Sequence, residues 1–387
     1  MLQIDHVYEF LYQELFKDFE VWYIPNGVPK LDNLNIHDIS IFTRKQIPDR
    51  KIFIFDQEPV LLNLLQPYLN FFQTNPIPSS FITSEKSKIV DDICSKFNFA
   101  PLYYFFHGFA ALDWYRGYHA LNYNKVIVKP YKHDYITFNR IINNDRSYRI
   151  YFVSKLKELG LLDKGLVSFN VTDNLFDDWR DETSDLNSKL SEHAKRHAEQ
   201  HLVNIDKLII DQANIHGNVS ADILRTIDGY WPNNDGPNFD ALWNIVTETV
   251  FYYDKLHLTE KVFKPIVSKQ PFMLLAAPGN LAYLRSYGFK TFDGIIDESY
   301  DKIIDNDQRI EAVVDQLRWY CNLSDSEKDN LIRAIEPIVL HNFHHFYGDF
   351  KKIITQELIT NTKNLFQDLG YADHHIDYDS IYKTLTH

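Results

Sequence analysis

The stretch from Thr247 to Phe292 constrains the fold most, because it combines several kinds of polar residue with the hydrophobic pattern of alternating strands and helices. It reads TETVFYYDKLHLTEKVFKPIVSKQPFMLLAAPGNLAYLRSYGFKTF. An apolar, β-prone run over residues 245–252 contains Glu248. A carboxylate near the end of a buried strand is costly unless a partner or a ligand satisfies it. We therefore expect a binding site at this point of the chain.

A helix over residues 260–268 is predicted shortly after this strand. Thr259 is a suitable N-cap, and the N–H groups of a first helical turn suit an anionic group such as a diphosphate. Lys261 adds positive charge there, and Glu260 is placed to accept hydrogen bonds from ribose hydroxyls, as an acidic residue does in dinucleotide-binding folds. Pro265 removes one hydrogen bond from the helix, which predicts that the helix is short or bent.

The second half of the stretch continues the alternation. Residues 270–277 have the pattern of a buried strand, Pro278-Gly279-Asn280 predicts a turn, and residues 281–287 predict a short helix that Gly288 ends. Strand, helix, strand and helix in this order make half of a doubly wound sheet. The fold class predicted is therefore α/β.

This arrangement resembles the donor-binding lobe of GT-B glycosyltransferases, in particular the α-1,3-fucosyltransferases and phage-encoded glycosyltransferases. His257-Leu258 stands where the fucosyltransferases have Tyr-Val, and the asparagine and serine that follow their first acid are absent. The resemblance implies two Rossmann-like lobes with a cleft between them and a C-terminal helix that returns to the first lobe. It also implies transfer of a sugar from a UDP- or GDP-sugar to an acceptor hydroxyl. The residues that carry it are Glu248, Thr259-Glu260-Lys261, Gln270-Pro271-Phe272 and Gly288-Phe289-Lys290-Thr291-Phe292.

The resemblance implies that residues 1–128 form the acceptor-binding lobe. A strand over residues 51–55 runs directly into Asp56, Gln57 and Glu58, and open α/β sheets bind ligands at the carboxyl ends of their strands. Glu58 or Asp56 is a candidate base for the acceptor hydroxyl, since a half-buried carboxylate gains basicity. The alternative is that one of them caps a helix beginning at Pro59. Further strands are expected at residues 19–24, 39–42, 79–83 and 102–106, with a helix at residues 85–97.

His107 follows the strand predicted over residues 102–106, so its position matches that of Glu58 and makes it a second candidate base. The alternative is a structural histidine that is hydrogen-bonded among aromatic residues. An aromatic-rich segment over residues 109–118 suits stacking on a sugar or a base, or belongs to the core of the lobe. The predicted acceptor contacts are Gln57, Asp113, Trp114 and Arg116.

The resemblance implies that residues 129–345 form the lobe that binds the nucleotide-sugar. A strand over residues 135–138 is followed by Asn139-Arg140 and by an arginine-bearing helix, an order that resembles the first strand, loop and helix of the phage-type donor lobe. The resemblance implies that Arg140, with Asn139, contacts the pyrophosphate, whose oxygens a planar guanidinium pairs. Arg149 either joins this contact or is an ordinary charge on the surface of the helix. Residues 346–387 are expected to form the C-terminal helical segment that packs back across the lobes.

His193, His197 and His201 recur every four residues in a polar segment, and a helix would place them on one face. The sequence shows no carboxylate or cysteine that completes a ligand set, and the His-Glu-x-x-His order is absent. We interpret this segment as an exposed helix face and predict no metal site. The Asp-x-Asp sequence at residues 305–307 lies in a predicted turn outside the donor motif. Transfer is therefore predicted to need neither a metal nor a cofactor, with Arg140 and Lys261 stabilising the leaving diphosphate.

Composition leaves the acceptor open. The 387 residues carry a formal net charge of -13, which disfavours broad attraction to nucleic acid or an anionic membrane without excluding a local basic cleft. The acceptor is either a glycan or a hydroxymethylated base in phage DNA. A catalytically inactive nucleotide- or glycan-binding protein of the same fold is the alternative function. No obligate protein partner is evident from the sequence.

Cysteine usage and hydropathy indicate the compartment. Only Cys94 and Cys321 are present, which argues against a disulfide framework. The first residues do not combine a basic start with an apolar core, and no apolar run approaches the roughly 20 residues that span a bilayer. We expect a cytoplasmic protein without a membrane span, in the host cytoplasm if a phage encodes it.

Overall fold

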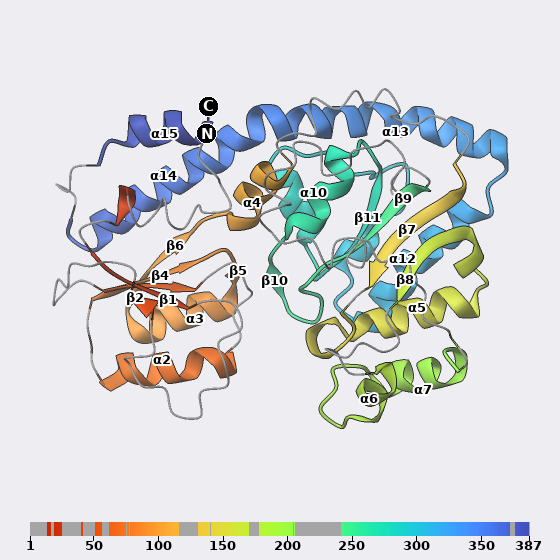
Figure 1. The fold of residues 1–387 in the computed structure, drawn as a ribbon, viewed down its shortest axis with the longest axis horizontal. Coiled ribbons are helices and arrows are strands. Elements are labelled where there is room, and N and C mark those ends of the chain that lie inside the picture. The colour runs from red at the N-terminus through yellow and green to blue at the C-terminus, as the bar shows by residue number, and fades with distance from the viewer. Residues whose placement is uncertain are drawn as a thin grey trace. The chain divides into compact units, whose positions relative to one another are not determined.

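The computed structural model describes residues 14–16, 19–24, 40–41, 51–55, 62–74, 76, 78–115, 131–139, 141–169, 178–203, 205, 241–371 and 376–386. These residues form a mixed α/β structure in which largely parallel sheets are flanked by helices (Figure 1). The chain divides into two compact units. Unit 1 comprises Met1–Asp113, Lys255–His257 and Gly348–His387, and unit 2 comprises Trp114–Asp254 and Leu258–Tyr347.

The sheet of unit 1 has five strands in the order β2-β1-β3-β4-β6. Only β2 is antiparallel among these strands, and the neighbours β1, β3, β4 and β6 run parallel. The predicted strand over residues 102–106 is displaced, because the pairing with β4 uses residues 99–103. The strands are β1 (Glu20–Ile24), β2 (Ser40–Ile41), β3 (Lys51–Phe55), β4 (Ser79–Thr83) and β6 (Phe99–Tyr103).

Helices cover both faces of this sheet (Figure 1). On one face α2 (Leu62–Thr74) and α3 (Lys88–Phe97) enclose an apolar core with Phe81 of β4 and Phe99 of β6. On the other face lies α14 (Lys351–Asp368), whose Asn361 Nδ2 donates to the Tyr103 carbonyl at 2.8 Å. Within unit 1, this C-terminal helix therefore packs on the sheet beside β6. The last helix, α15 (Tyr378–Thr386), packs on α14.

A short antiparallel pair in unit 1 joins β5 (Lys86–Ser87) to β10 (Lys255–Leu256). Beside it Lys255 Nζ lies 3.1 Å from Glu85 Oε2, and the two side chains are 1% and 0% exposed. Because β5 occupies residues 86–87, the helix predicted from residue 85 begins only at Lys88, where Ser87 caps α3 by accepting from the Val90 amide.

The sheet of unit 2 has four parallel strands in the order β11-β9-β7-β8. All seven residues of β9 are buried, as expected for a strand with helices on both faces. The strand predicted over residues 245–252 begins four residues earlier, at Ala241, and ends at Thr247. Glu248 therefore follows the strand directly. The strands are β7 (His133–Asn139), β8 (Gly165–Phe169), β9 (Ala241–Thr247) and β11 (Phe272–Leu275).

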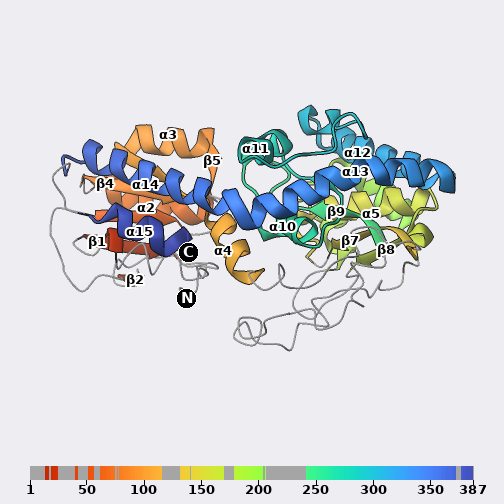
Figure 2. The ribbon, with the colours of Figure 1, turned by 90° about the horizontal axis from the view of Figure 1, so that it is seen from above.

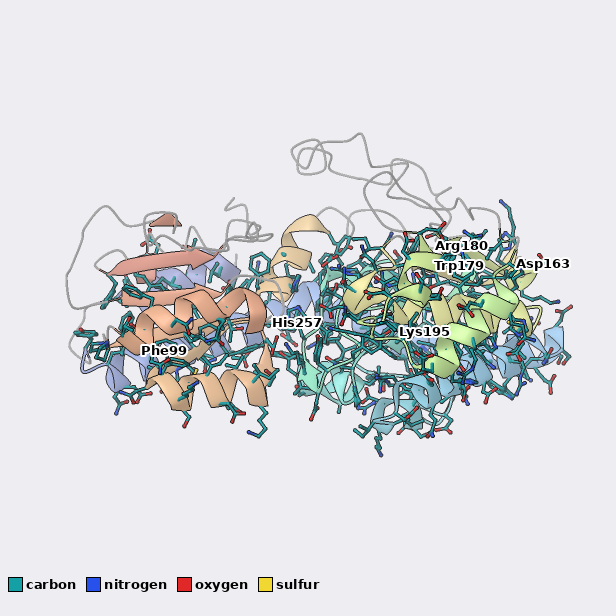
Figure 3. All side chains as sticks on the ribbon, turned by 90° about the horizontal axis from the view of Figure 1, so that it is seen from below. Phe99, Asp163, Trp179, Arg180, Lys195 and His257 are labelled. Atoms are coloured by element: carbon teal, nitrogen blue, oxygen red, sulfur yellow. The ribbon has the colours of Figure 1, made fainter. Side chains whose placement is uncertain are left out.

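Helices also cover both faces of the second sheet. On one side α5 (Tyr148–Glu158) packs against α12 (Asn306–Cys321). On the other, α10 (Glu260–Val267) packs against α13 (Asp325–His345), and Figure 2 shows α13 crossing over α10. Two further helices, α6 (Trp179–Ser184) and α7 (Glu192–His201), lie outside α5. Figure 3 labels Trp179, which is 2% exposed, and Arg180, whose guanidinium lies 4.7 Å from the Trp179 ring centroid.

The short helix α11 (Asn280–Ser286) is fixed at both ends. Asp301 accepts from the amides of the first turn, at residues 281 and 282. At the other end Gly288 has φ +91°, and the imidazoles of His341 and His345 lie with Nε2 3.0 and 2.6 Å from the carbonyls of residues 288 and 287. Two of the three histidines near the end of α13 thus serve as a C-terminal cap for α11.

Remaining short elements connect these layers. They are α4 (Phe106–Trp114), the 3₁₀ turns Asn144–Arg146, Leu162–Lys164 and Ser299–Lys302, and a π-helical turn Phe346–Phe350. Cys94 and Cys321 are both buried free thiols, and burial raises the pKa of each to about 12. Within the described part of the chain, none of the helices has the length and apolarity needed to cross a bilayer.

Candidate functional site

The strand order of unit 2 creates a topological switch point between β7 and β9. The chain passes from β7 to β8 on one side, then returns to the other side of β7 to form β9 and β11. In open parallel sheets, ligands bind outside the carboxyl ends of the strands at such a point. Asn139 ends β7 and Thr247 ends β9, and Thr247 Oγ1 donates to the Phe138 carbonyl at 2.9 Å. Both loops that leave these strands therefore start at the position where a ligand is expected.

Arg149 and Tyr148, at the start of α5, hydrogen-bond to the backbone at the carboxyl ends of β7 and β9. Arg149 is 3% exposed, and its terminal nitrogens donate to the carbonyls of residue 141 at 2.9 Å and Thr247 at 2.7 Å. Tyr148 Oη donates to the Glu248 carbonyl at 2.6 Å. The interpretation of Arg149 as a surface charge is wrong, because burial and these bonds make it an internal link between the loops after β7 and β9.

Glu248 lies directly after β9 and is fully buried, at 0% exposed. Its carboxylate accepts from the Thr259 amide at 3.2 Å, the Thr259 hydroxyl at 2.5 Å and the Thr249 amide at 3.2 Å. The partner that a buried carboxylate requires is thus Thr259, the residue that caps α10. This bond joins the carboxyl end of β9 to the first turn of α10, and it places a negative charge near the positive end of the helix.

The next two residues, Glu260 and Lys261, form the accessible part of the site. Their side chains are 22% and 36% exposed, and Lys261 Nζ lies 3.1 Å from Glu260 Oε1. Lys261 Nζ also donates to the hydroxyls of Thr249 and Thr259, at 3.2 and 3.3 Å. The predicted helix forms over Glu260–Val267, one residue shorter than expected, with Pro265 inside it. A carboxylate and an ammonium therefore stand together at the start of α10.

A second polar group at this edge comes from residues that the sequence analysis did not select. Ser147 Oγ and Tyr252 Oη are 2.8 Å apart, so the loops after β7 and β9 bond to each other. Tyr253 Oη donates to Asp145 at 3.2 Å, and Lys189 contacts both of these side chains. Asp145 and Lys189 are far in sequence from residues 247–292, where the sequence analysis looked for the site. Within that stretch, the neighbouring tyrosines Tyr252 and Tyr253 were the one sequence feature that could have indicated this polar group.

Most of the predicted acceptor and base residues lie outside the described residues. This holds for Asp56, Gln57, Glu58 and Arg116, for the predicted donor contact Arg140, and for the side chains of Asp113 and Trp114 in the last turn of α4. His107 is described, and its predicted position after a strand is wrong. Because β6 ends at Tyr103, His107 falls in the first turn of α4, 8% exposed, with its ring edge-on to that of His257.

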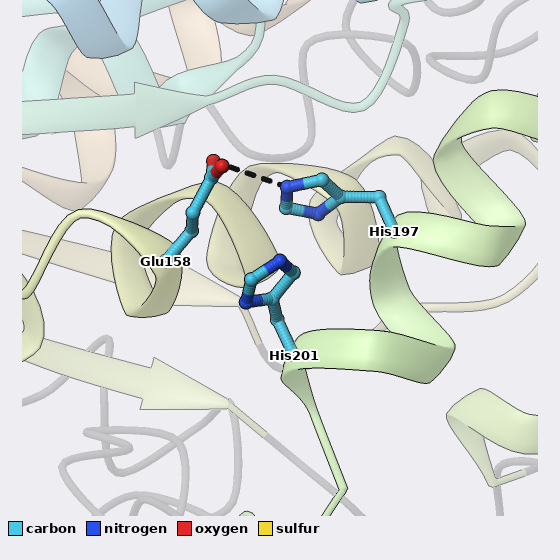
Figure 4. A group of neighbouring side chains, drawn as sticks. All are labelled: Glu158, His197 and His201. Carbon is cyan, nitrogen blue, oxygen red and sulfur yellow. Dashed lines mark hydrogen bonds and ion pairs between the residues drawn. The ribbon is translucent and has the colours of Figure 1, made fainter.

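The histidines of α7 do not form an exposed face as interpreted from the sequence. The His197 side chain is only 9% exposed, and its Nε2 lies 3.1 Å from Glu158 Oε2 of α5 (Figure 4). His201 stacks on His197 with ring centroids 4.4 Å apart. Burial, opposed by the Glu158 hydrogen bond, lowers the pKa of His197. His193 turns elsewhere, toward Tyr151 Oη at 3.0 Å. The carboxylate near this helix face was missed because it lies on another helix.

Two polar sites in unit 2 thus emerge from the described residues. One joins the switch point of the sheet to the first turn of α10, and the other joins the end of α5 to α7. Neither depends on a contact with unit 1. In comparisons with known proteins, no family model, no curated protein and no solved structure matches this chain.

Proposed function

We propose that this chain is a glycosyltransferase of the GT-B type, which moves a sugar from a nucleotide-sugar to an acceptor hydroxyl. The observation that carries the proposal is the first turn of α10, where Glu260 and Lys261 stand partly exposed beside the switch point of a parallel sheet. Carboxylate and ammonium groups at such a point suit the two polar parts of a nucleotide-sugar, its ribose hydroxyls and its diphosphate.

In the proposed binding mode, Glu260 accepts hydrogen bonds from the ribose and Lys261 neutralises the diphosphate. Thr259 and Glu248 hold the first turn in place, because their hydrogen-bonding groups are directed at each other. Arg149 likewise positions the loops after β7 and β9. Asn139 ends β7, the strand next to β9, and is a further proposed contact to the donor.

The proposed reaction is a displacement at the anomeric carbon of the donor sugar. The acceptor oxygen bonds to that carbon while the bond from the carbon to the diphosphate oxygen breaks, and the bonding electrons leave with the nucleoside diphosphate. Arg140, Lys261 and the amides of α10 stabilise the charge that develops on the leaving group, so the transfer needs no metal. The acceptor proton passes to a base in the first unit. The candidates for that base are Glu58, Asp56 and His107.

A panel of nucleotides tests the donor site. Thermal unfolding is measured with UDP, GDP, dTDP, CDP and their common sugars, for the parent protein and for Glu260→Ala. A ligand at about 100 times its dissociation constant should stabilise the parent by roughly 2.7 kcal/mol. The matched control is Glu336→Ala, because Glu336 is an exposed glutamate of α13. We expect one nucleotide to stabilise the parent and Glu336→Ala, and to stabilise Glu260→Ala less.

The results of these measurements distinguish a glycosyltransferase from a catalytically inactive nucleotide-binding protein. If none of the nucleotides stabilises the folded parent, the donor site is refuted. If one binds but its sugars are neither hydrolysed nor transferred, the chain is a nucleotide-binding protein of this fold. Transfer that persists in excess chelator, assayed well below the unfolding temperature, supports the metal-independent mechanism. Binding of duplex DNA that falls steeply with salt favours a modified base as acceptor, whereas a neutral glycan should bind almost independently of salt.

A further inference from the structure

The side chains of Glu158, His197 and His201 converge at the outer face of α5, where α7 packs on it (Figure 4). Each contributes one potential ligand atom, and these atoms all lie within 4.8 Å of one another. His197 and His201 are one helical turn apart, which places both imidazoles on the same side of α7. Two imidazoles and a carboxylate form one of the ligand sets that bind zinc with a coordination position left for water.

Hydrogen bonds at both ring nitrogens hold the His197 imidazole in one orientation. Ser154 Oγ donates its one proton to the Tyr151 carbonyl, 2.7 Å away. The same oxygen lies 2.8 Å from His197 Nδ1, so Ser154 hydrogen-bonds this ring nitrogen. The tautomer that donates from Nδ1 to Ser154 leaves the Nε2 lone pair for a metal, which would replace the hydrogen bond from Nε2 to Glu158. A hydrogen-bonded Nδ1 that leaves Nε2 as the donor atom is the usual arrangement of a metal-ligating histidine.

His197 Nε2 also faces a carboxylate. It lies 3.1 Å from Glu158 Oε2 and is hydrogen-bonded to it, so the two potential ligand atoms already point at each other. On a tetrahedral zinc ion, ligand atoms about 2.0–2.2 Å from the metal are separated by roughly 3.3 Å. The two atoms therefore need to separate by only a few tenths of an ångström to bind one zinc ion.

We propose that Glu158, His197 and His201 form a site for a divalent transition metal, with zinc as the expected ion. His197 is fixed by Ser154, and the more exposed Glu158 and His201 close onto the metal. Lys155 is the competitor, because its ammonium lies 2.6 Å from Glu158 Oε2 and must yield when the metal binds. The bound ion ties α7 to α5. The site shares no residue with the proposed donor site and does not depend on it.

Metal binding is tested on the untagged full-length protein after removal of metal with a chelator. Zinc uptake is measured by isothermal titration, and cobalt is added as a spectroscopic probe of tetrahedral coordination. We expect one zinc ion per chain and visible cobalt absorption bands. His201→Ala and Glu158→Gln should each weaken binding at least tenfold, and Ser154→Ala about tenfold through loss of the oriented imidazole. Lys155→Met should bind zinc more tightly than the parent.

The matched control is His193→Ala, because His193 lies on the same helix but contacts Tyr151 and Glu311. It should bind zinc like the parent. The proposal is overturned if the parent takes up no zinc, or if His201→Ala binds as tightly as the parent does. It is also overturned if His197 titrates as an imidazolium paired with Glu158 near neutral pH by NMR and zinc does not displace that proton.

Discussion

Replacing Thr259 by valine tests the link between the sheet and α10 most directly. Valine has nearly the same shape, so the substitution removes the hydroxyl and leaves the backbone amide and most of the packing in place. The hydroxyl donates to Glu248 at 2.5 Å and accepts from the Lys261 amide at 3.4 Å. Both partners lose a hydrogen bond where Thr259 is 2% and Glu248 is 0% exposed.

The size of the effect follows from these two bonds. Loss of an N-cap side chain costs about 1 kcal/mol, and loss of a hydrogen bond to a buried carboxylate costs about 1.5–3 kcal/mol. Thr259→Val should therefore lower the free energy of unfolding of unit 2 by about 3 kcal/mol. Thr259→Ser is the matched control, because serine keeps the hydroxyl and loses one buried methyl group, a cost of about 1 kcal/mol.

Urea unfolding, followed by circular dichroism and by tryptophan fluorescence, measures both variants. Because the chain has two units, it can unfold in two transitions. The loss of stability should fall on the transition of unit 2, in which Trp243 of β9, 0% exposed in the folded state, becomes exposed. An unchanged slope with denaturant shows that the midpoint shift reflects stability. If Thr259→Val loses no more stability than Thr259→Ser, the bond to Glu248 does not hold the site together and the reasoning fails.

Two further predictions concern other parts of unit 2. Gly288→Ala should cost about 2 kcal/mol, because φ is +91° and a Cβ would lie 2.7 Å from the His345 ring. Gly294→Ala, at φ +83° with nothing in the described part of the chain within 4 Å of its Cβ position, should cost about 1 kcal/mol; equal losses in urea would show that the His345 contact is harmless. Burial raises the pKa of Glu298, so its contribution to stability is fully present below the unfolded pKa and lost as pH rises through the folded pKa. The stability of the parent relative to Glu298→Gln should therefore rise as the pH falls from about 7 to about 4, and a difference that does not change with pH would contradict this.

The sequence predicted the helices and strands of residues 247–292 well because each has a local signal. Thr259 caps α10, Gly288 ends α11 in the left-handed region, and the apolar run of β11 is short and continuous. Periodicity and capping depend on residues a few positions apart, so they can be read without knowing the fold. The need of Glu248 for a partner was also readable, since it follows from the cost of burying a charge.

The predictions that failed depended on pairing between distant segments. Helix α3 begins later than predicted because residues 86–87 pair with residues 255–256. Strand β6 begins earlier than predicted because its pairing with β4 sets its register. Glu158 and His197 are 39 positions apart, and only the packing of α7 on α5 brings them together. Arg149 looked like a surface charge because its acceptors are backbone carbonyls, which have no signature in the sequence.

The loop between β9 and α10 shows why one bond can matter for the whole site. The loop spans residues 249–258, and its two ends, Glu248 and Thr259, bond to each other. Inside it Tyr252 bonds to Ser147 and the Phe251 carbonyl accepts from Arg309, a buried arginine whose pKa burial lowers to about 10. The loop is thus closed at its base and fixed to α5 and α12. Because closure of a loop removes conformational freedom that a ligand would otherwise have to remove, the start of α10 is preorganised for the nucleotide proposed to bind there.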